Sequence, residues 1–193
     1  MEMTLGENLQ VTLFGESHGP AVGAVIQGIP KGTPIDAELL ANDLAKRKPG
    51  GKLASKRKET DECEILAGMY QGHATGWPIL LLIRNKDARS SDYSFLPDHP
   101  RPGHADMLEN ARSSGHADLR GGGSHSARLT AGLVASSSLC RPLMEKYGWK
   151  VDAHVCSVGD IDSIPLEQLT EMSDEENCKL TRCKDPLAAA SMV

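Results

Sequence analysis

Two strand-like runs on either side of a short loop constrain the fold of this chain more than any other feature. The runs cover residues 9–14 and 22–26, and the loop at 15–19 reads Gly-Glu-Ser-His-Gly. This is the G-x-S-x-G pattern of a hydrolase nucleophile elbow, in which a strand turns sharply into a helix. The residues after the loop are β-branched and interrupted by glycine, a composition that favours a strand. We therefore predict strand, loop, strand over residues 9–28.

The loop also collects groups that can carry chemistry. Ser17 and His18 are neighbours, and the carboxylate of Glu16 precedes them. One interpretation is a serine hydrolase with Ser17 as its nucleophile, which covalent labelling by a fluorophosphonate would detect. The alternative is a loop that binds a ligand without a covalent step.

Further elements follow along the chain. Asp36 can cap a helix through about residue 46, and the glycines at 121–123 open a helical pattern that ends at 147, before Gly148. The other predicted segments are strands at 62–69 and 149–158, an apolar run at 79–83, a loop at 86–103, an acidic stretch at 167–176 and a short apolar end without a clear partner.

The stretch Gly-Gly-Gly-Ser-His-Ser at residues 121–126 has two explanations. Unhindered backbone N–H groups at a helix start, together with hydroxyl groups, suit a bound phosphate. The Gly-Lys-Ser/Thr ending of a P-loop is missing, so the stretch does not match that motif. A tight turn with a serine N-cap explains the same residues without a ligand. The spacing alone leaves both explanations open.

Composition excludes several classes of protein. The 193 residues carry a formal net charge of −5, which gives no general affinity for nucleic acid, and no apolar stretch reaches the roughly 20 residues of a membrane span. The N-terminus has no pattern of a secretory signal, and the five scattered cysteines indicate free thiols in the cytoplasm. The i, i+2 spacing does not favour a metal site, and we predict none; the residues that could form one are His104, Asp106, His116 and Asp118.

Positive charge is concentrated in and after a glycine-rich connection. The basic side chains there are Arg47, Lys48, Lys52, Arg57 and Lys58. They either face a polyanionic small molecule or form a solvated surface. Two loop histidines, His18 and His104, add groups suited to acid–base chemistry on a phosphorylated substrate.

Four stretches, taken together and in order, resemble the signature segments of chorismate synthase. They are residues 14–19 (Phe-Gly-Glu-Ser-His-Gly), 83–93 (Ile-Arg-Asn-Lys-Asp-Ala-Arg-Ser-Ser-Asp-Tyr), 101–106 (Arg-Pro-Gly-His-Ala-Asp) and 118–131 (Asp-Leu-Arg-Gly-Gly-Gly-Ser-His-Ser-Ala-Arg-Leu-Thr-Ala). Because the four motifs stand in register, the match is specific.

The resemblance implies a fold and an activity. Members of that family are α+β proteins with a β-α-β sandwich in one domain, so residues 1–193 would belong to a single domain, and they assemble as homotetramers. They convert 5-enolpyruvylshikimate 3-phosphate to chorismate by anti-1,4-elimination of phosphate and the C6 proton, a lyase step of the shikimate pathway to the aromatic amino acids. The family requires reduced FMN although the reaction has no net redox change. The sequence leaves open whether NADPH reduces that flavin on the protein itself.

The resemblance also assigns roles to individual residues. His18 would lie near the leaving phosphate and His104 near the flavin, both as proton donors. The binding residues implied are Ser17, Arg47, Arg101 and Arg128 for the anionic ligands, and Arg47, Ser124, His125 and Ser126 for the flavin. We expect Lys52, in the same basic connection as Arg47, to contact an anion as well. A cationic site with an acid agrees with phosphate expulsion, because the charge that develops there must be neutralised.

Two departures from the family pattern bear on these expectations. This chain has Ser-His-Ser at 124–126 and Arg-Leu-Thr-Ala at 128–131, where many members have Arg-Ser-Ser and Arg-Glu-Thr-Ala. The family's chain also continues for nearly the same length again. Residues 1–193 therefore resemble its N-terminal half, apparently truncated at the C-terminal side. An inactive fragment that only binds phosphate or flavin is the alternative to the enzyme.

Overall fold

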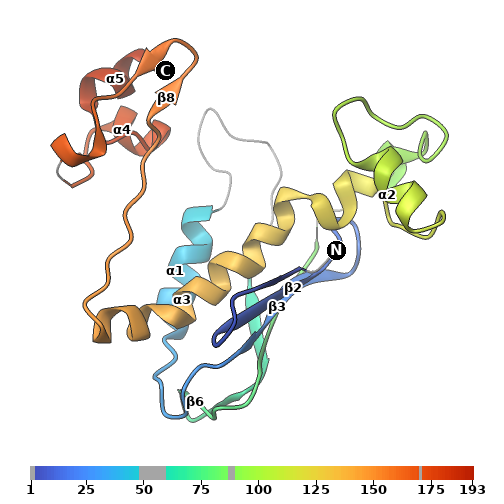
Figure 1. Cartoon of the computed structure of the whole chain (residues 1–193), viewed down its shortest axis with the longest axis horizontal. Coiled ribbons are helices and arrows are strands. Elements are labelled where there is room, and N and C mark those ends of the chain that lie inside the picture. The colour runs from blue at the N-terminus through green and yellow to red at the C-terminus, as the bar shows by residue number, and fades with distance from the viewer. Residues whose placement is uncertain (1–2, 48–59, 87–89, 170) are drawn as a thin grey trace. The chain divides into compact units, whose positions relative to one another are not determined.

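The computed structural model of the chain describes residues 3–47, 60–86, 90–169 and 171–193 (Figure 1). The described residues fall into two compact units, which divide between Gly148 and Trp149. The predicted α+β class is confirmed, because the first unit combines a sheet with packed helices. That residues 1–193 belong to a single domain stays a prediction.

An antiparallel sheet of five strands is the framework of the first unit, in the order β1-β2-β3-β7-β4. Its strands are β1 (Thr4–Leu5), β2 (Gln10–Gly15), β3 (Ala21–Gln27), β7 (Ile79–Arg84) and β4 (Cys63–Ala67). A separate hairpin consists of β5 (Met69–Tyr70) and β6 (His73–Ala74). The strand, loop, strand prediction is confirmed, because β2 pairs with β3 on either side of the Ser17 loop.

Alternation along the two central strands places one face of the sheet in the core. Cross-strand partners on β3 and β7 are buried together, as the pair Val22 and Ile83 shows. The fully buried positions are Val22, Ala24 and Ile26 on β3 and Ile79, Leu81 and Ile83 on β7. A period of two residues is what a strand with one covered face requires.

Two helices cover that face, α1 (Ala37–Arg47) and α3 (Thr130–Lys146), which lie side by side in Figure 1. Asp36 caps α1 as predicted, because its Oδ1 accepts hydrogen bonds from the backbone N–H groups of Glu38 (2.9 Å) and Leu39 (3.0 Å). Asp43 joins the two helices: its Oδ2 accepts from Ser138 Oγ at 2.9 Å and from Arg141 at 2.5 Å.

The helix predicted over residues 121–147 is shorter than expected, because α3 begins at Thr130. Before it lie two 3-10 turns, η2 (Arg120–His125) and η3 (Ala127–Leu129). Residues 121–123 all have positive φ and leave the right-handed helical region. The predicted end of the helix is confirmed, since Gly148 follows it with φ of +69°.

The second unit contains short elements only. They are β8 (Ser157–Val158), β9 (Ile161–Asp162), the 3-10 turn η4 (Leu166–Gln168), α4 (Glu176–Thr181) and α5 (Pro186–Ser191). The strand predicted at 149–158 is wrong except for its last two residues, which alone find a partner in β9. The apolar end does have a partner, because Ala189 packs with Cys178 and Cys183.

The long loop predicted at 86–103 contains the 3-10 turn η1 (Ser90–Tyr93) among its described residues, and α2 (Asp106–Arg112) follows it. All five cysteines are free thiols, as predicted. Among the described residues, no helix has the length and apolar character needed to cross a membrane.

Gly132 lets α3 lie close to the sheet. A Cβ at this position would lie 2.5 Å from the carbonyl oxygen of Gly23 on β3. Such a distance is shorter than van der Waals contact, so a larger residue forces the helix away from the strand.

We predict that Gly132→Ala lowers the free energy of unfolding by about 1–3 kcal/mol, the usual cost of overpacking. The loss is expected even though alanine favours a helix by about 1 kcal/mol over glycine. Ser137→Ala, at an exposed position of the same helix, is the control and should change the value by no more than about 0.5 kcal/mol. Urea unfolding followed by circular dichroism measures both, and an unchanged Gly132→Ala would show that the helix can shift freely.

Candidate functional site

Two hydrogen bonds from Ser17 join its loop to the glycine turn η2. The backbone N–H of Ser17 donates to Gly123 O at 3.1 Å, and the Ser17 hydroxyl donates to Arg120 O at 3.1 Å. The same hydroxyl lies 3.0 Å from Nδ1 of His18. Ser17 is fully buried and His18 is half-buried, so the buried serine hydroxyl holds the inner edge of the imidazole.

Gly121 is required at this contact. A Cβ there would lie 2.3 Å from His18 Cε1 and 2.6 Å from Ser17 Oγ, and the residue has φ of +59°. Only glycine combines that conformation with that approach. The serine N-cap proposed for this stretch is also confirmed, because the Ser126 hydroxyl accepts from Arg128 N at 3.3 Å.

The loop does not have the geometry of a nucleophile elbow. After Ser17 the chain enters β3 and not a helix. An elbow exposes its serine oxygen to the substrate, whereas Ser17 is fully buried and its hydroxyl contacts His18 and Arg120 O. The structure therefore favours the non-covalent interpretation of this loop.

Tyr93 packs against His18 and was not predicted as a site residue. The two rings meet edge to face, with centroids 4.8 Å apart and planes at 76°. The guanidinium carbon of Arg101 lies 5.3 Å from the centroid of the same tyrosine. Tyr93 thus links a predicted acid to a predicted anion-binding residue, through edge-to-face and cation–π contacts.

Arg101 is oriented by a bidentate ion pair with Asp106. Its Nε lies 2.8 Å and its NH2 2.7 Å from the two carboxylate oxygens, and its backbone N–H donates to the same group at 3.0 Å. These hydrogen bonds hold the pKa of Asp106 below its ordinary value, although burial of the carboxyl group opposes the shift.

Asp118 makes a second pair of the same kind with Arg120, at 2.8 and 2.7 Å. The pairing lowers the pKa of Asp118, with a smaller contribution from the nearby charge of His18. Both carboxylates among the residues that could have formed a metal site, Asp106 and Asp118, are therefore paired with arginine. In the part of the chain that the structure describes, no three histidine, cysteine or acidic side chains are arranged to hold a metal ion.

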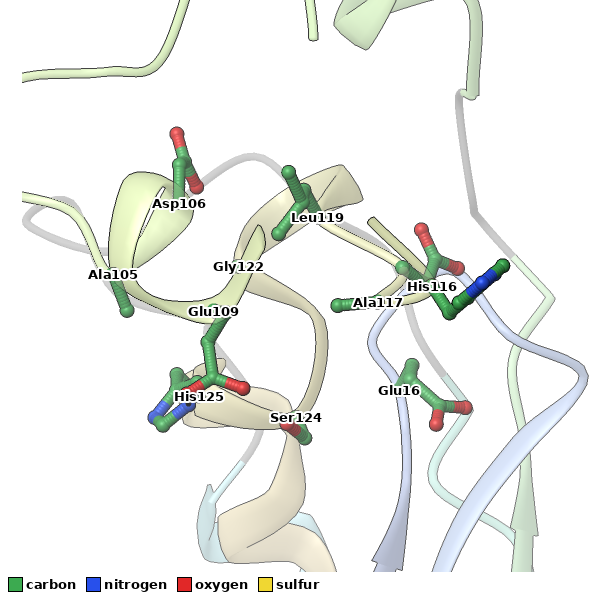
Figure 2. Close-up of a pocket in the computed structure, with 11 residues that line it drawn as sticks. Glu16, Ala105, Asp106, Glu109, His116, Ala117, Leu119, Gly122, Ser124 and His125 are labelled. Carbon is green, nitrogen blue, oxygen red and sulfur yellow. Dashed lines mark ion pairs between the residues drawn. The ribbon is translucent and has the colours of Figure 1, made fainter. Parts of the chain in front are cut away.

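A cavity of about 120 Å³ lies between α2 and η2, and Figure 2 shows the side chains that line it. His125 and Glu109 stand on one side and Glu16 and His116 on the other. Nε2 of His125 lies 3.0 Å from Glu109 Oε1, a contact that lowers the pKa of Glu109. Ser124 also lines this cavity, so two of the predicted flavin residues meet here.

A second cavity, of about 380 Å³, adjoins the first. The two share residues 117–119 in their walls. Tyr93 and Arg120 line only the second cavity. An aromatic residue and an arginine therefore border the larger space.

Arg47 and Arg128 meet on one carboxylate that was not predicted. Asp61 accepts a hydrogen bond from Arg47 NH1 at 2.8 Å, and its other oxygen pairs with NH1 of Arg128. The side chain of Arg128 is only 3% exposed, so it contacts protein groups and not the surface. Asn85, likewise not predicted, accepts from Arg128 Nε at 2.9 Å.

The remaining predicted residues are less closely gathered. His104 is exposed, and among the described contacts no hydrogen bond or ring contact joins it to His18. Lys52 lies outside the described residues. Three more residues of the predicted basic cluster, Lys48, Arg57 and Lys58, also lie outside them.

Comparison with known proteins relates this chain to one family. A family model described as chorismate synthase matches residues 9–193. Chorismate synthase from Aeropyrum pernix is 44% identical over 184 residues, which cover 95% of this chain and 47% of the relative. That from Methanothermobacter thermautotrophicus is 42% identical, over 97% of this chain and 50% of the relative. The chain thus spans about half the length of the curated relatives it matches.

A solved structure agrees with the sequence relatives. It is titled as the crystal structure of chorismate synthase and aligns with a TM-score of 0.66 at 26% identity. The alignment covers 96% of this chain and 51% of the solved one.

The contact between the glycine turn and His18 gives a first prediction for the site. Gly121→Ala and Gly122→Ala should each lower the free energy of unfolding by about 1–2 kcal/mol, because both residues have positive φ. Only Gly121→Ala should displace the His18 ring, since a Cβ at Gly122 meets nothing nearer than 3.8 Å. The imidazole resonances of His18 in an NMR spectrum report the difference. Equal spectra for the two variants would contradict the assigned contact.

A second prediction concerns pH. The folded-state pKa of Asp106 is lowered, so its ion pair contributes stability that is complete above the unfolded value of about 3.9 and is lost as pH falls through the lower folded value. The stability difference between wild type and Asp106→Asn should therefore be constant at neutral pH and vanish in strong acid. Thermal unfolding across that range measures it, with Asp98→Asn, an exposed aspartate of the preceding loop, as the control. A difference that persists in strong acid would argue against the ion pair.

Proposed function

The chain belongs to the chorismate synthase family, and on that premise we propose that it takes part in converting 5-enolpyruvylshikimate 3-phosphate to chorismate by anti-1,4-elimination of phosphate. The observation that carries the proposal is the fixed imidazole of His18, held by Ser17 on one side and packed by Tyr93 on another. A general acid must be positioned before it can protonate a leaving group, and here the position is set by the fold.

His18 is the proposed acid for the departing phosphate. Its Nδ1 faces the Ser17 hydroxyl, so Nε2 is the atom that would carry the proton to the phosphate oxygen. The imidazole lies within electrostatic range of Asp118, whose pKa is lowered chiefly by Arg120 and also by His18. A nearby carboxylate favours the protonated form of an imidazole, the form that can donate a proton.

The cations around the loop would neutralise the phosphate as its charge develops. Arg101 and Arg120 are each preoriented by a carboxylate, and Arg47 is fixed at the end of α1. Arg128 is too buried to contact a ligand in this arrangement, so we assign it a supporting role. Lys52 remains a proposed anion contact outside the described residues.

Reduced FMN is the proposed cofactor, and the residues present fit it. Ser124 and His125 line the smaller cavity. Gly122, which has a positive φ, is also part of its wall. The ring of Tyr93 borders the adjoining space and is suited to contact with an aromatic group. Since the family's reaction has no net redox change, the flavin would supply and recover electrons within one turnover. His104 would donate a proton near the flavin, and NADPH is proposed as the reductant that prepares it.

Assembly and location complete the proposal. We expect a homotetramer in the cytoplasm, where the five free thiols of this chain would remain reduced. This expectation rests on the family and on the absence of disulfides among the cysteines, all of which are described.

We predict that, in a chain of the family's full length, His18→Ala and His104→Ala each reduce turnover by about 10²- to 10⁴-fold, the contribution of a general acid, while substrate binding changes far less. The assay follows chorismate by absorbance under anaerobic conditions with reduced FMN, and calorimetry measures binding of 5-enolpyruvylshikimate 3-phosphate. His73→Ala, at an exposed histidine of the β5–β6 hairpin, is the control and should leave turnover unchanged. Normal turnover in either site variant removes that histidine from the mechanism. Wild-type protein without turnover or substrate binding would refute the proposed function.

A further inference from the structure

A buried carboxylate connects the arginines beside the His18 loop. The Asp61 side chain is fully buried just before β4. One of its oxygens accepts from Arg47 at 2.8 Å and the other pairs with Arg128. Because an unpaired buried charge is costly, the two guanidinium groups and this carboxylate must keep their mutual geometry.

Arg47 has little freedom once Asp61 is in place. Its Nε donates to Thr130 Oγ1 at 3.1 Å, and its NH2 donates to the carbonyl oxygen of Ala127 at 3.1 Å. The guanidinium plane is therefore fixed against η3 and the start of α3. With 18% of its side chain exposed, Arg47 stays partly accessible to solvent.

Arg128 transmits the same constraint to the His18 loop through Asn85. The amide oxygen of Asn85 accepts from Arg128 Nε at 2.9 Å. Its Nδ2 donates to the carbonyl oxygens of Glu16 at 3.0 Å and Gly19 at 2.8 Å, which flank Ser17 and His18 in the chain. The arginine thus fixes which way the amide faces, and the amide holds both ends of the loop.

The backbone of Asp61 indicates that this position is demanding. Its φ is +50°, in the left-handed region that few residues other than glycine, asparagine and aspartate enter. Such conformations persist where the surrounding structure requires them, often at functional sites. Aspartate here combines a tolerated conformation with a charge that reaches both arginines.

We propose that Asp61 is a positioning residue of this site: it orients Arg47 toward an anionic ligand and, through Arg128 and Asn85, holds the loop that carries His18. The inference rests on the proposed function, since it is the phosphorylated substrate or the flavin phosphate that Arg47 would meet. Asp61 itself touches neither the ligand nor the reacting atoms.

Asp43 offers a matched control within the same unit. Its carboxylate is also largely buried, and it joins α1 to α3 through Ser138 and Arg141. None of its recorded hydrogen bonds leads to the His18 loop. A purely structural role for Asp61 therefore predicts that Asp61→Asn and Asp43→Asn behave alike.

The first measurement does not depend on catalysis. Asparagine keeps the shape and the backbone tolerance of aspartate but removes its charge. In NMR spectra of the ligand-free protein, Asp61→Asn should move the imidazole resonances of His18, whereas Asp43→Asn should leave them in place. Unchanged His18 resonances in Asp61→Asn would overturn the proposal, whether or not the protein shows turnover.

The second measurement addresses the reaction. Asp61→Asn should raise KM for 5-enolpyruvylshikimate 3-phosphate by about tenfold or more, as for a weakened charged hydrogen bond, and lower kcat by about 10- to 100-fold through misplacement of His18. Asp43→Asn should lower the melting temperature without either kinetic change. Equal kinetics for the two variants would reduce Asp61 to a structural residue. Absence of turnover in the wild type would instead count against the proposed function. The His18 resonances would still show whether Asp61 acts as a positioning residue.

Discussion

The contact between the Ser17 loop and the glycine turn is the constraint on which the rest of the site depends. Two hydrogen bonds from Ser17 cross to Gly123 and Arg120, far along the chain, and they form only because Gly121 lacks a side chain. The positive φ values keep residues 121–123 out of the right-handed helical conformation, and α3 begins only at Thr130. One local backbone requirement thus shortens a helix and places an imidazole.

Electrostatics in this region follows a single pattern, in which each arginine beside the loop is committed to a carboxylate. Asp106 orients Arg101 and Asp118 orients Arg120, and the lowered pKa values of both acids show that the charged forms are stabilised. A guanidinium that is already oriented loses less freedom when it binds an anion. Preorientation therefore favours anion binding more than a flexible basic surface would.

Much of the framework could be predicted from the sequence, because local patterns determine it. β-branched residues after the Ser17 loop indicated a strand, and Asp36 indicated a helix start, since both depend on neighbours within a few residues. The strand at 149–158 was mispredicted because a strand also needs a partner, and only Ser157–Val158 has one. The loop residues themselves indicated His18, and the resemblance added Arg101, yet neither could show which groups hold these side chains.

Asp61, Asn85 and Tyr93 illustrate what sequence patterns cannot reveal. Each acts through contacts with residues far away in the chain, and the type of residue alone gives no indication of the partner. Asp61 and Asp43 are the same kind of residue, each buried and paired with arginine. For the His18 loop, the difference that matters is what their arginine partners contact next.

That difference shows why a buried ion pair should be judged by its connections. Arg141, the partner of Asp43, belongs to α3 itself and ties one helix to another, a stabilising contact that could be replaced by apolar packing. The arginines on Asp61 lead instead to the start of α3 and, through an amide, to both carbonyl groups that flank Ser17 and His18. Apolar residues of the same volume could fill that space but could not donate to those carbonyl groups. The loop is thus held from two directions, by the glycine turn on one side and by a charged network on the other, and both constraints converge on the imidazole of His18.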